Sequence, residues 1–263
     1  MLDRKRKYLQ IAFNRNLEEI KSMIYSLPLS DQILIEVGYP LIKRYGVEAI
    51  RKIRQWWTEK IFTHLIEIPS TKSKLLTHFL IKSLSKTLTE DQRELAQKET
   101  ETTFAPYIVA DLKCMDRAFA EVETAKLAGA SAVTCLGLAP TETINLFVEK
   151  CEEFGLDSIL DMLNVDYPFE VLQKLKRPPK IIMLHRGVDE GEENKEREIP
   201  YHEIERIKSV YDDVLIAVAG GETIEEVVHG TFNGADIVVV WRLFNENQEN
   251  ITKLANEFLK EIK

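Results

Sequence analysis

The feature that most constrains the fold is a repeated alternation between short apolar runs and longer amphipathic stretches. The apolar runs are nearly continuous, as in ILIEV at 33–37 and DIVVV at 236–240, and a stretch with helical spacing follows each one. Strands that are apolar on both faces are typical of a parallel sheet that lies under a layer of helices. Eight such units favour a closed (β/α)₈ TIM barrel over an open doubly wound sheet.

Each predicted unit consists of a strand and the helix that follows it. Strands are expected at 8–13, 33–37, from 107 onward, and at 131–136, 158–163, 180–184, 214–218 and 236–240. Helices are expected at 17–27, 41–57, 115–128, 141–154, 168–175, 201–211, 223–229 and 250–262.

One connection breaks this rhythm. The link between the second helix and the third strand is far longer than the roughly 2–6 residues that are usual there. We therefore predict one barrel domain over 1–263 with a helical insertion at 58–105, whose helical composition is clearest at 75–84 and 90–101. An insertion before a strand belongs on the face opposite the active site. A partly disordered decoration and an oligomer contact or lid are both open as its role.

Composition narrows the class of protein. Acidic side chains outnumber basic ones, 43 against 35, and the net charge of -8 argues against a nucleic-acid partner. The three cysteines form no C-x-x-C pair, so we expect no disulfide framework and a cytoplasmic location. The first apolar run, at 8–13, is too short for a secretory leader, and no later run is long enough to cross a membrane.

Three charged residues follow the apolar start of the third strand, in the DLKCMD segment that begins at Asp111. Side chains alternate along a strand, so Asp111 and Lys113 leave on the same face, and Asp116 follows in the turn. A carboxylate beside an ammonium on an inward face is costly unless the two are paired, hydrated or bound to a ligand. Alone, this pair would be interpreted as a structural ion pair.

Polar residues or glycines end nearly all the other predicted strands as well. Barrel enzymes build their active sites from the C-terminal ends of their strands, so these residues are expected to meet at one rim. The strand ends carry Asn14, Glu36, Thr134, Asp161, Asn164, His185, Arg186, Gly220, Gly221 and Arg242.

Two kinds of chemistry are open to the charged members of this rim. Glu36 and Asp111 end adjacent strands, where two carboxylates could hold Mg²⁺ against substrate oxygens. Alternatively, Glu36 pairs with Lys113 or Lys43 and no metal binds. His185 could transfer protons, or it could be a plain hydrogen-bonded histidine.

The last two strand ends suggest an anion site. Gly220 and Gly221 precede a predicted helix and could present backbone N–H groups to a phosphate. Arg242 ends the neighbouring strand, in the place where barrels often hold phosphate.

Several segments together resemble the 3-hexulose-6-phosphate synthase family of the orotidine 5'-monophosphate decarboxylase suprafamily. The resemblance covers the barrel apart from the insertion. It is carried by LQIAFN at 9–14, IEVGYPLIK at 35–43, DLKCMD at 111–116, ASAVTCLG at 130–137, DMLNV at 161–165, His185, AVAGG at 217–221 and GADIVVV at 234–240. The metal-dependent branch of the suprafamily has Glu in the I-E-x-G position, where the orotidylate decarboxylases have Lys, so Glu36 indicates the metal branch.

The resemblance implies roles for the residues that match the family motifs. Glu36 and Asp111 would be Mg²⁺ ligands, and Lys113 would be the cation near a developing enediolate. Asp116 would reach the active site of the partner subunit in a homodimer, and His185 would be an acid/base group. A metal and an ammonium that stabilise charge on adjacent oxygens form a coherent set for this chemistry.

The same resemblance places the substrate's phosphorylated end on the other side of the rim. Gly220, Gly221 and Arg242 would hold the phosphate of a small phosphorylated sugar, and Asn14 and Arg186 would also contact substrate. The expected function is an aldolase-type lyase that acts on ribulose 5-phosphate and formaldehyde.

Three positions depart from the family pattern. Asn14 stands where the family has Asp, and Trp241 stands where it has the Gly of a Gly-Arg pair. The segment from His185 to Val188 also lacks the second Arg of the gulonate decarboxylases, which disfavours that related sugar-phosphate decarboxylase. We expect the Trp241 ring to point outward beside a bulge, because an inward ring would block a phosphate. The alternative function is a repurposed, non-catalytic barrel that acts as a binding or assembly protein.

Overall fold

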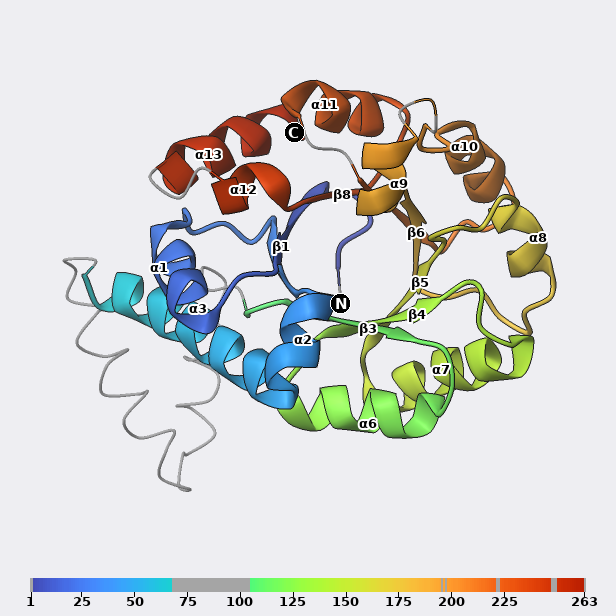
Figure 1. Ribbon diagram of the computed structural model, residues 1–263, viewed down its shortest axis with the longest axis horizontal. Helices are drawn as coiled ribbons and strands as arrows, with labels where there is room; N and C mark the ends of the chain where they lie inside the picture. Colours follow the sequence, from blue (N-terminus) through green and yellow to red (C-terminus); the bar gives the residue numbers. More distant parts are fainter. Residues whose placement is uncertain are drawn as a thin grey trace, which may run out of the picture.

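The computed structural model describes residues 2–67, 105–194, 196, 198–220, 223–246 and 250–262. Its centre is a closed barrel of eight parallel strands in sequential order, with helices around it (Figure 1). The strands are β1 (Tyr8–Phe13), β2 (Ile33–Val37), β3 (Ile108–Cys114), β4 (Ala132–Leu136), β5 (Asp157–Asp161), β6 (Ile181–His185), β7 (Leu215–Ala219) and β8 (Ile237–Val240). The predicted (β/α)₈ TIM barrel is confirmed.

The helices keep the predicted order, with some changes of length. They are α1 (Leu17–Ser26), α2 (Tyr39–Tyr45), α3 (Val47–Glu67), α6 (Ala118–Ala128), α7 (Thr141–Phe154), α8 (Pro168–Gln173), α9 (Val188–Glu193), α10 (His202–Lys208), α11 (Ile224–Phe232), α12 (Arg242–Glu246) and α13 (Ile251–Glu261). Among the described helices, none is both long enough and apolar enough to cross a bilayer.

Two apolar layers hold the barrel, and successive residues of a strand alternate between them. Along β8, Val238 and Val240 pack into the layer between strands and helices, whereas Ile237 and Val239 pack inside the barrel. The outer layer is much the larger, because nearly all the described helices contribute side chains to it; α9 is the exception. This is why the strands are apolar on both faces, as the sequence indicates.

The predicted helix at 41–57 is wrong in its bounds. The chain forms two helices there, α2 and α3, separated by Gly46, and α3 continues to Glu67. Residues 58–67 of the predicted insertion continue α3, and Ile61 among them is buried in the outer layer. The insertion itself stays a prediction. The rest of the predicted insertion, including the helices expected at 75–84 and 90–101, lies outside the described residues.

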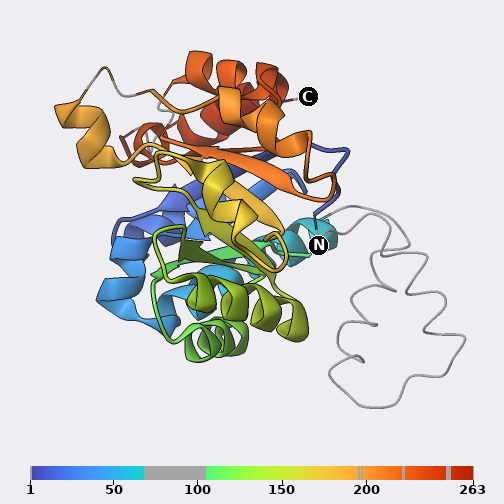
Figure 2. The same cartoon turned by 90° about the vertical axis from the view of Figure 1, so that its right-hand side faces the viewer.

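Two short helices at one end of the barrel were not predicted. Helix α9 has no buried side chain, and α12 is only 5 residues long, so neither carries a clear apolar periodicity. Seen from the side, α9 lies at the end of the barrel opposite the N-terminus (Figure 2). This is the end that carries the C-terminal strand tips.

Candidate active site

A pocket of about 600 Å³ opens at the C-terminal ends of the strands. Most of the residues expected at the rim line this pocket together. They are Asn14, Glu36, Asp111, Lys113, Asp161, Asn164, His185, Arg186, Gly220 and Arg242. Thus residues that are up to 228 positions apart in the chain meet because each one ends, or directly follows, a strand of the same parallel barrel.

Asp111 is held in a fixed orientation by its neighbours. Its Oδ1 accepts a hydrogen bond of 2.8 Å from the Thr134 hydroxyl on β4, and its Oδ2 accepts one of 3.3 Å from the Tyr39 backbone N–H. The Lys113 ammonium lies 3.3 Å from the same Oδ2. The carboxylate is almost fully buried, and three partners from three elements position it.

Lys113 has an unusual backbone conformation, with a φ of +46°. The register between β3 and β4 shifts at this point, between Ala110 and Cys114. The Thr134 hydroxyl accepts a 2.9 Å hydrogen bond from the Lys113 N–H, so one side chain supports both the bulge and Asp111. A left-handed conformation at a non-glycine residue is costly and tends to occur at functional sites.

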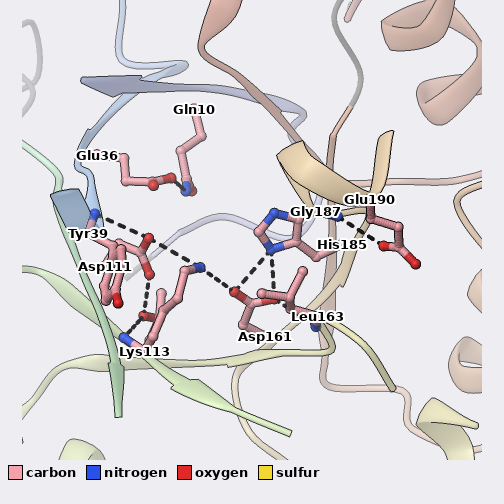
Figure 3. Close-up of polar contacts among 11 residues, drawn as sticks. Gln10, Glu36, Tyr39, Asp111, Lys113, Asp161, Leu163, His185, Gly187 and Glu190 are labelled. Atoms are coloured by element: carbon pink, nitrogen blue, oxygen red, sulfur yellow. Dashed lines mark hydrogen bonds and ion pairs between the residues drawn. The ribbon is translucent and has the colours of Figure 1, made fainter. Parts of the chain in front are cut away.

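The Lys113 ammonium links two carboxylates. It donates to Asp161 Oδ2 at 2.9 Å and lies close to Asp111, as Figure 3 shows. Burial lowers the pKa of this ammonium, but Asp111 and Asp161 outweigh burial and hold the pKa above its usual value. Lys113 is therefore a permanent cation at neutral pH.

Asp161 also fixes His185. The Nδ1 atom of His185 lies 2.8 Å and 3.0 Å from the two oxygens of Asp161, and the Leu163 N–H donates to the same carboxylate. Burial raises the pKa of Asp161, but His185 and Lys113 outweigh it and lower the pKa to about 2. Burial likewise lowers the pKa of His185, and Asp161 outweighs it and raises this pKa. The pair therefore favours a charged imidazolium.

Glu36 faces the same pocket from β2 but takes no part in this chain of ion pairs. Its Oε2 accepts a 2.5 Å hydrogen bond from the Gln10 amide, inside the barrel. Burial and the charge of Asp111 raise the pKa of Glu36 to about 7, although the Gln10 hydrogen bond opposes this. The alternative in which Glu36 pairs with Lys43 or Lys113 is not what the structure shows, since Lys43 lies 4.4 Å from the centre of the Tyr39 ring and Lys113 pairs with aspartates.

These carboxylates fit a divalent cation. Glu36 and Asp111 end adjacent strands, and burial together with the charge of Asp111 raises the pKa of Glu36, so a cation there would favour its charged form. Within the described parts of the chain, no group of three or more His, Cys, Asp or Glu side chains is placed to hold a metal. Two carboxylates completed by water and substrate oxygens match the usual coordination of Mg²⁺ better than that of zinc.

Asn14 lines the pocket beside β2. Its Oδ1 is buried and finds no hydrogen-bond partner among the described residues. A Cβ atom at Gly38 would lie only 1.8 Å from this oxygen, so the tip of β2 must be glycine for Asn14 to adopt its position. The Asn14 amide is thus a polar group without charge, at the position where the family resemblance expects a carboxylate.

Arg186 lines the pocket, and its guanidinium also supports the tip of β7. Nη2 donates to the Gly220 carbonyl at 2.8 Å and lies 3.3 Å from Glu226 Oε1 on α11. Gly220 has a φ of +100°, and a Cβ there would lie 2.4 Å from the Arg186 carbonyl oxygen. Position 220 therefore favours glycine, and the Arg186 side chain supports the backbone there. Gly221, the second predicted glycine of the anion site, lies outside the described residues.

The prediction that the Trp241 ring points outward is wrong. The pairing of β8 with β1 and β7 is regular through Val239 and Val240, with no bulge. The alternation therefore continues, and Trp241 packs on the inner apolar layer and lines the pocket. The ring borders the pocket without closing it, because Gly220 and Arg242 line the same space.

Arg242 begins α12 directly after this ring. Its guanidinium carbon lies 5.2 Å from the centre of the Trp241 ring, and its Nη2 donates to Glu192 Oε1 of α9 at 2.7 Å. Asp116, in contrast, is exposed in the turn after β3 and does not line the pocket of its own chain. Asp116 is the one described residue of the predicted set that the fold leaves apart.

The sequence interpretation missed several residues of the site. Asp161 and Thr134 were noted as strand ends, but their bridging roles follow from the positions of Lys113 and Asp111. Gln10 left one signal, because it is the only amide in the otherwise apolar strand β1. Glu192 left none, since it lies in a run of acidic residues that would be expected on any solvated surface.

A family model and similar curated proteins indicate the same family. The model of the "Orotidine 5'-phosphate decarboxylase / HUMPS family" matches residues 86–244. The chain is 33% identical to a bifunctional enzyme Fae/Hps of Methanothrix thermoacetophila, over 97% of the chain and 53% of that protein. It is 34% identical to the Fae/Hps of Methanosarcina acetivorans, over 96% of the chain and 52% of the relative. The chain thus spans about half the length of the curated relatives it matches.

Solved structures show the same fold. The 3-hexulose-6-phosphate synthase from Salmonella typhimurium aligns with a TM-score of 0.66 at 23% identity, over 97% of this chain and 99% of the other. The KGPDC from Streptococcus mutans aligns with a TM-score of 0.66 at 17% identity, over 98% and 97%. With a family model that matches more than half of its residues, the chain belongs to the orotidine 5'-phosphate decarboxylase / HUMPS family.

Proposed function

We propose that this barrel is a Mg²⁺-dependent, aldolase-type lyase that acts on a phosphorylated sugar through an enediolate. The proposed substrates are ribulose 5-phosphate and formaldehyde, by analogy with the names of the Fae/Hps relatives and of the Salmonella typhimurium 3-hexulose-6-phosphate synthase. The observation that carries the proposal is the Lys113 ammonium, which two buried aspartates hold at the floor of the pocket beside Glu36.

The proposed chemistry needs positive charge beside two neighbouring oxygens. Removal of a proton from C1 of ribulose 5-phosphate leaves an enediolate, with negative charge shared between the oxygens on C1 and C2. Lys113 keeps its proton at neutral pH, so it can stabilise this charge without being consumed. Mg²⁺ held by Glu36 and Asp111 would supply Lewis-acid stabilisation to the same oxygens.

The proposal assigns the proton transfers to His185. Asp161 engages its Nδ1, so Nε2 is the ring nitrogen that would exchange a proton with substrate. In the condensation, C1 loses a proton to a base, a bond forms between C1 and the formaldehyde carbon, and the aldehyde oxygen gains a proton. Only the neutral form of His185 can accept the first proton, and the raised pKa makes this form scarcer. The imidazolium that results then gives a proton to the aldehyde oxygen, so the step balances.

A homodimer with shared active sites is part of this proposal. Asp116 is exposed and lies outside its own pocket, which suits a residue that reaches the site of a partner subunit. Met115 and Phe119 beside it are also exposed apolar side chains, with 43% and 44% of their surface accessible. Exposed apolar groups close to a functional residue favour an interface there.

The inward ring of Trp241 favours a second candidate function. If the indole takes the volume of a phosphate, the barrel would serve as a binding or assembly protein.

Hydrogen–deuterium exchange at C1 of ribulose 5-phosphate separates the two functions, because enediolate formation exchanges this proton even without formaldehyde. We expect Mg²⁺-dependent exchange in D₂O, followed by NMR. No exchange by the wild type above the buffer rate would contradict the lyase proposal.

A further inference from the structure

Helix α9 lies along the pocket and carries an unusual density of negative charge. Four of its six residues are acidic, namely Asp189, Glu190, Glu192 and Glu193. The first three of these line the pocket, together with Val188 and Gly191. Such a surface repels a phosphate unless its carboxylates are paired or move away. An acidic helix beside the proposed phosphate site therefore calls for an explanation.

The key contact joins this helix to the arginine of the proposed phosphate site. Arg242 donates to Glu192 at 2.7 Å, and the side chains keep 25% and 57% of their surface exposed. The Trp241 ring also contacts this side chain, with its centre 5.2 Å from the guanidinium carbon. The guanidinium is therefore supported by an indole, and a carboxylate occupies one of its donors.

A phosphate and a carboxylate compete for the same arginine donors. Both present a pair of oxygens to the N–H groups of a guanidinium, and a phosphate dianion carries more charge and more acceptor oxygens. The Glu192 contact is partly exposed, so it is worth little by itself and is readily exchanged. An incoming phosphate can thus replace Glu192 at modest cost.

We propose that Glu192 binds Arg242 in the place that the substrate phosphate takes later. This contact is a latch: it holds α9 over the pocket until a phosphate binds Arg242. In the empty site Glu192 holds Arg242 and keeps α9 over the pocket. When a phosphate takes Arg242, Glu192 is displaced and the acidic helix moves away from the bound dianion. This inference rests on the proposed function only in that it assumes a phosphorylated ligand.

The local structure of α9 suits a release of this kind. The helix buries no side chain, so its displacement exposes no core residue. Glycines lie at its start and in its middle, at Gly187 and Gly191, and Glu190 Oε2 accepts from the Gly187 N–H within the same segment at 3.2 Å. The helix can keep this internal contact while Glu192 leaves Arg242.

The test compares two charge-neutralising substitutions on the same helix. Glu192→Gln removes the competing charge, whereas Glu193→Gln makes the same change of net charge at the next residue, which is exposed and does not line the pocket. Calorimetric titration with inorganic phosphate and with ribulose 5-phosphate should show binding about threefold to fivefold tighter in Glu192→Gln. Glu193→Gln should stay close to the wild type.

Amide hydrogen exchange of residues 188–194 gives a second readout. Phosphate should speed exchange in the wild type, and Glu192→Gln should exchange faster even without phosphate. If the wild type binds ribulose 5-phosphate and Glu192→Gln changes neither affinity nor exchange, the latch is wrong and the proposed function stands. If inorganic phosphate shows the expected differences but C1 exchange of the sugar fails, the latch stands and the lyase is wrong. If no variant binds either ligand, both are wrong.

Discussion

The two halves of the pocket rim are built in different ways. From β3 to β6, Asp111, Lys113, Asp161 and His185 form one continuous chain of ion pairs and hydrogen bonds, and both aspartates are buried. From β6 to β8, the arginines instead bind acidic residues on surrounding helices, and the contact of Arg242 is partly exposed. The first half is assembled before any ligand arrives, whereas the second is held by contacts that a ligand can exchange.

The largest expected effect comes from the preassembled half. Lys113→Met removes the cation that stabilises the enediolate and leaves two aspartates without their common partner. We expect the rate of C1 proton exchange of ribulose 5-phosphate to fall by roughly 10²–10³-fold, as for the loss of one preorganised stabilising group. Circular dichroism should confirm folding, and an exchange rate within a few-fold of the wild type would show that Lys113 is structural.

The next effect concerns the metal. Neither Glu36 nor Asp111 alone supplies enough oxygen ligands, so Asp111→Asn should weaken Mg²⁺ binding by more than the roughly 10–100-fold that follows loss of an outer-sphere partner. Isothermal titration calorimetry measures this directly. Asp212→Asn is the matched control, because Asp212 is exposed and does not line the pocket. Equal Mg²⁺ affinity in the wild type and Asp111→Asn would make the carboxylate pair structural.

Substitutions in the half of the rim from β6 to β8 should change the affinity for the sugar phosphate. Arg242→Ala should weaken the binding of ribulose 5-phosphate by roughly 1.5–3 kcal/mol, as expected for a charge-assisted hydrogen bond. Trp241→Gly should weaken this binding if the indole chiefly supports Arg242, and should strengthen it if the ring fills the phosphate volume. A wild type that binds no ribulose 5-phosphate, beside a Trp241→Gly variant that does, would show that the ring fills the phosphate volume.

The smallest effect is a change in a single titration. Asp161 raises the pKa of His185, so the imidazolium should persist to higher pH than in a free histidine, and the stabilisation from this pair should be lost as pH rises through the raised pKa. In Asp161→Asn burial remains while the attraction is lost, so the pKa of His185 should fall below 6.5. NMR of the ring protons, assigned with His185→Gln, measures both values. An unchanged pKa would mean that the two side chains are not coupled in solution.

The sequence was sufficient for the barrel and for much of the rim, for one physical reason. A strand buried on both faces must be apolar until it ends, so the first polar residue after each run marks the C-terminal tip. That rule located Glu36, Asp111 and His185 and brought them to one pocket.

The rule says nothing about which side chains pair across strands, and there the predictions were incomplete. Asp161 bridges Lys113 and His185 only because the barrel places β3, β5 and β6 tips around one point. The direction of Trp241 depended on whether β8 contains a bulge, which sequence patterns do not reveal. The contact of Glu192 with Arg242 joins two short helices that lack an apolar period, so nothing in the sequence marked it.

The measurement that tests the central claim most directly is the condensation itself. Ribulose 5-phosphate and ¹³C-formaldehyde are incubated with the protein and Mg²⁺, and ¹³C NMR follows the label. The account predicts a six-carbon ketose phosphate that carries the label in a new carbon–carbon bond, with formation abolished by chelation of Mg²⁺ and strongly reduced in Lys113→Met. Labelled formaldehyde that stays unincorporated with the wild type, while bound ribulose 5-phosphate is detected by calorimetry, would contradict it.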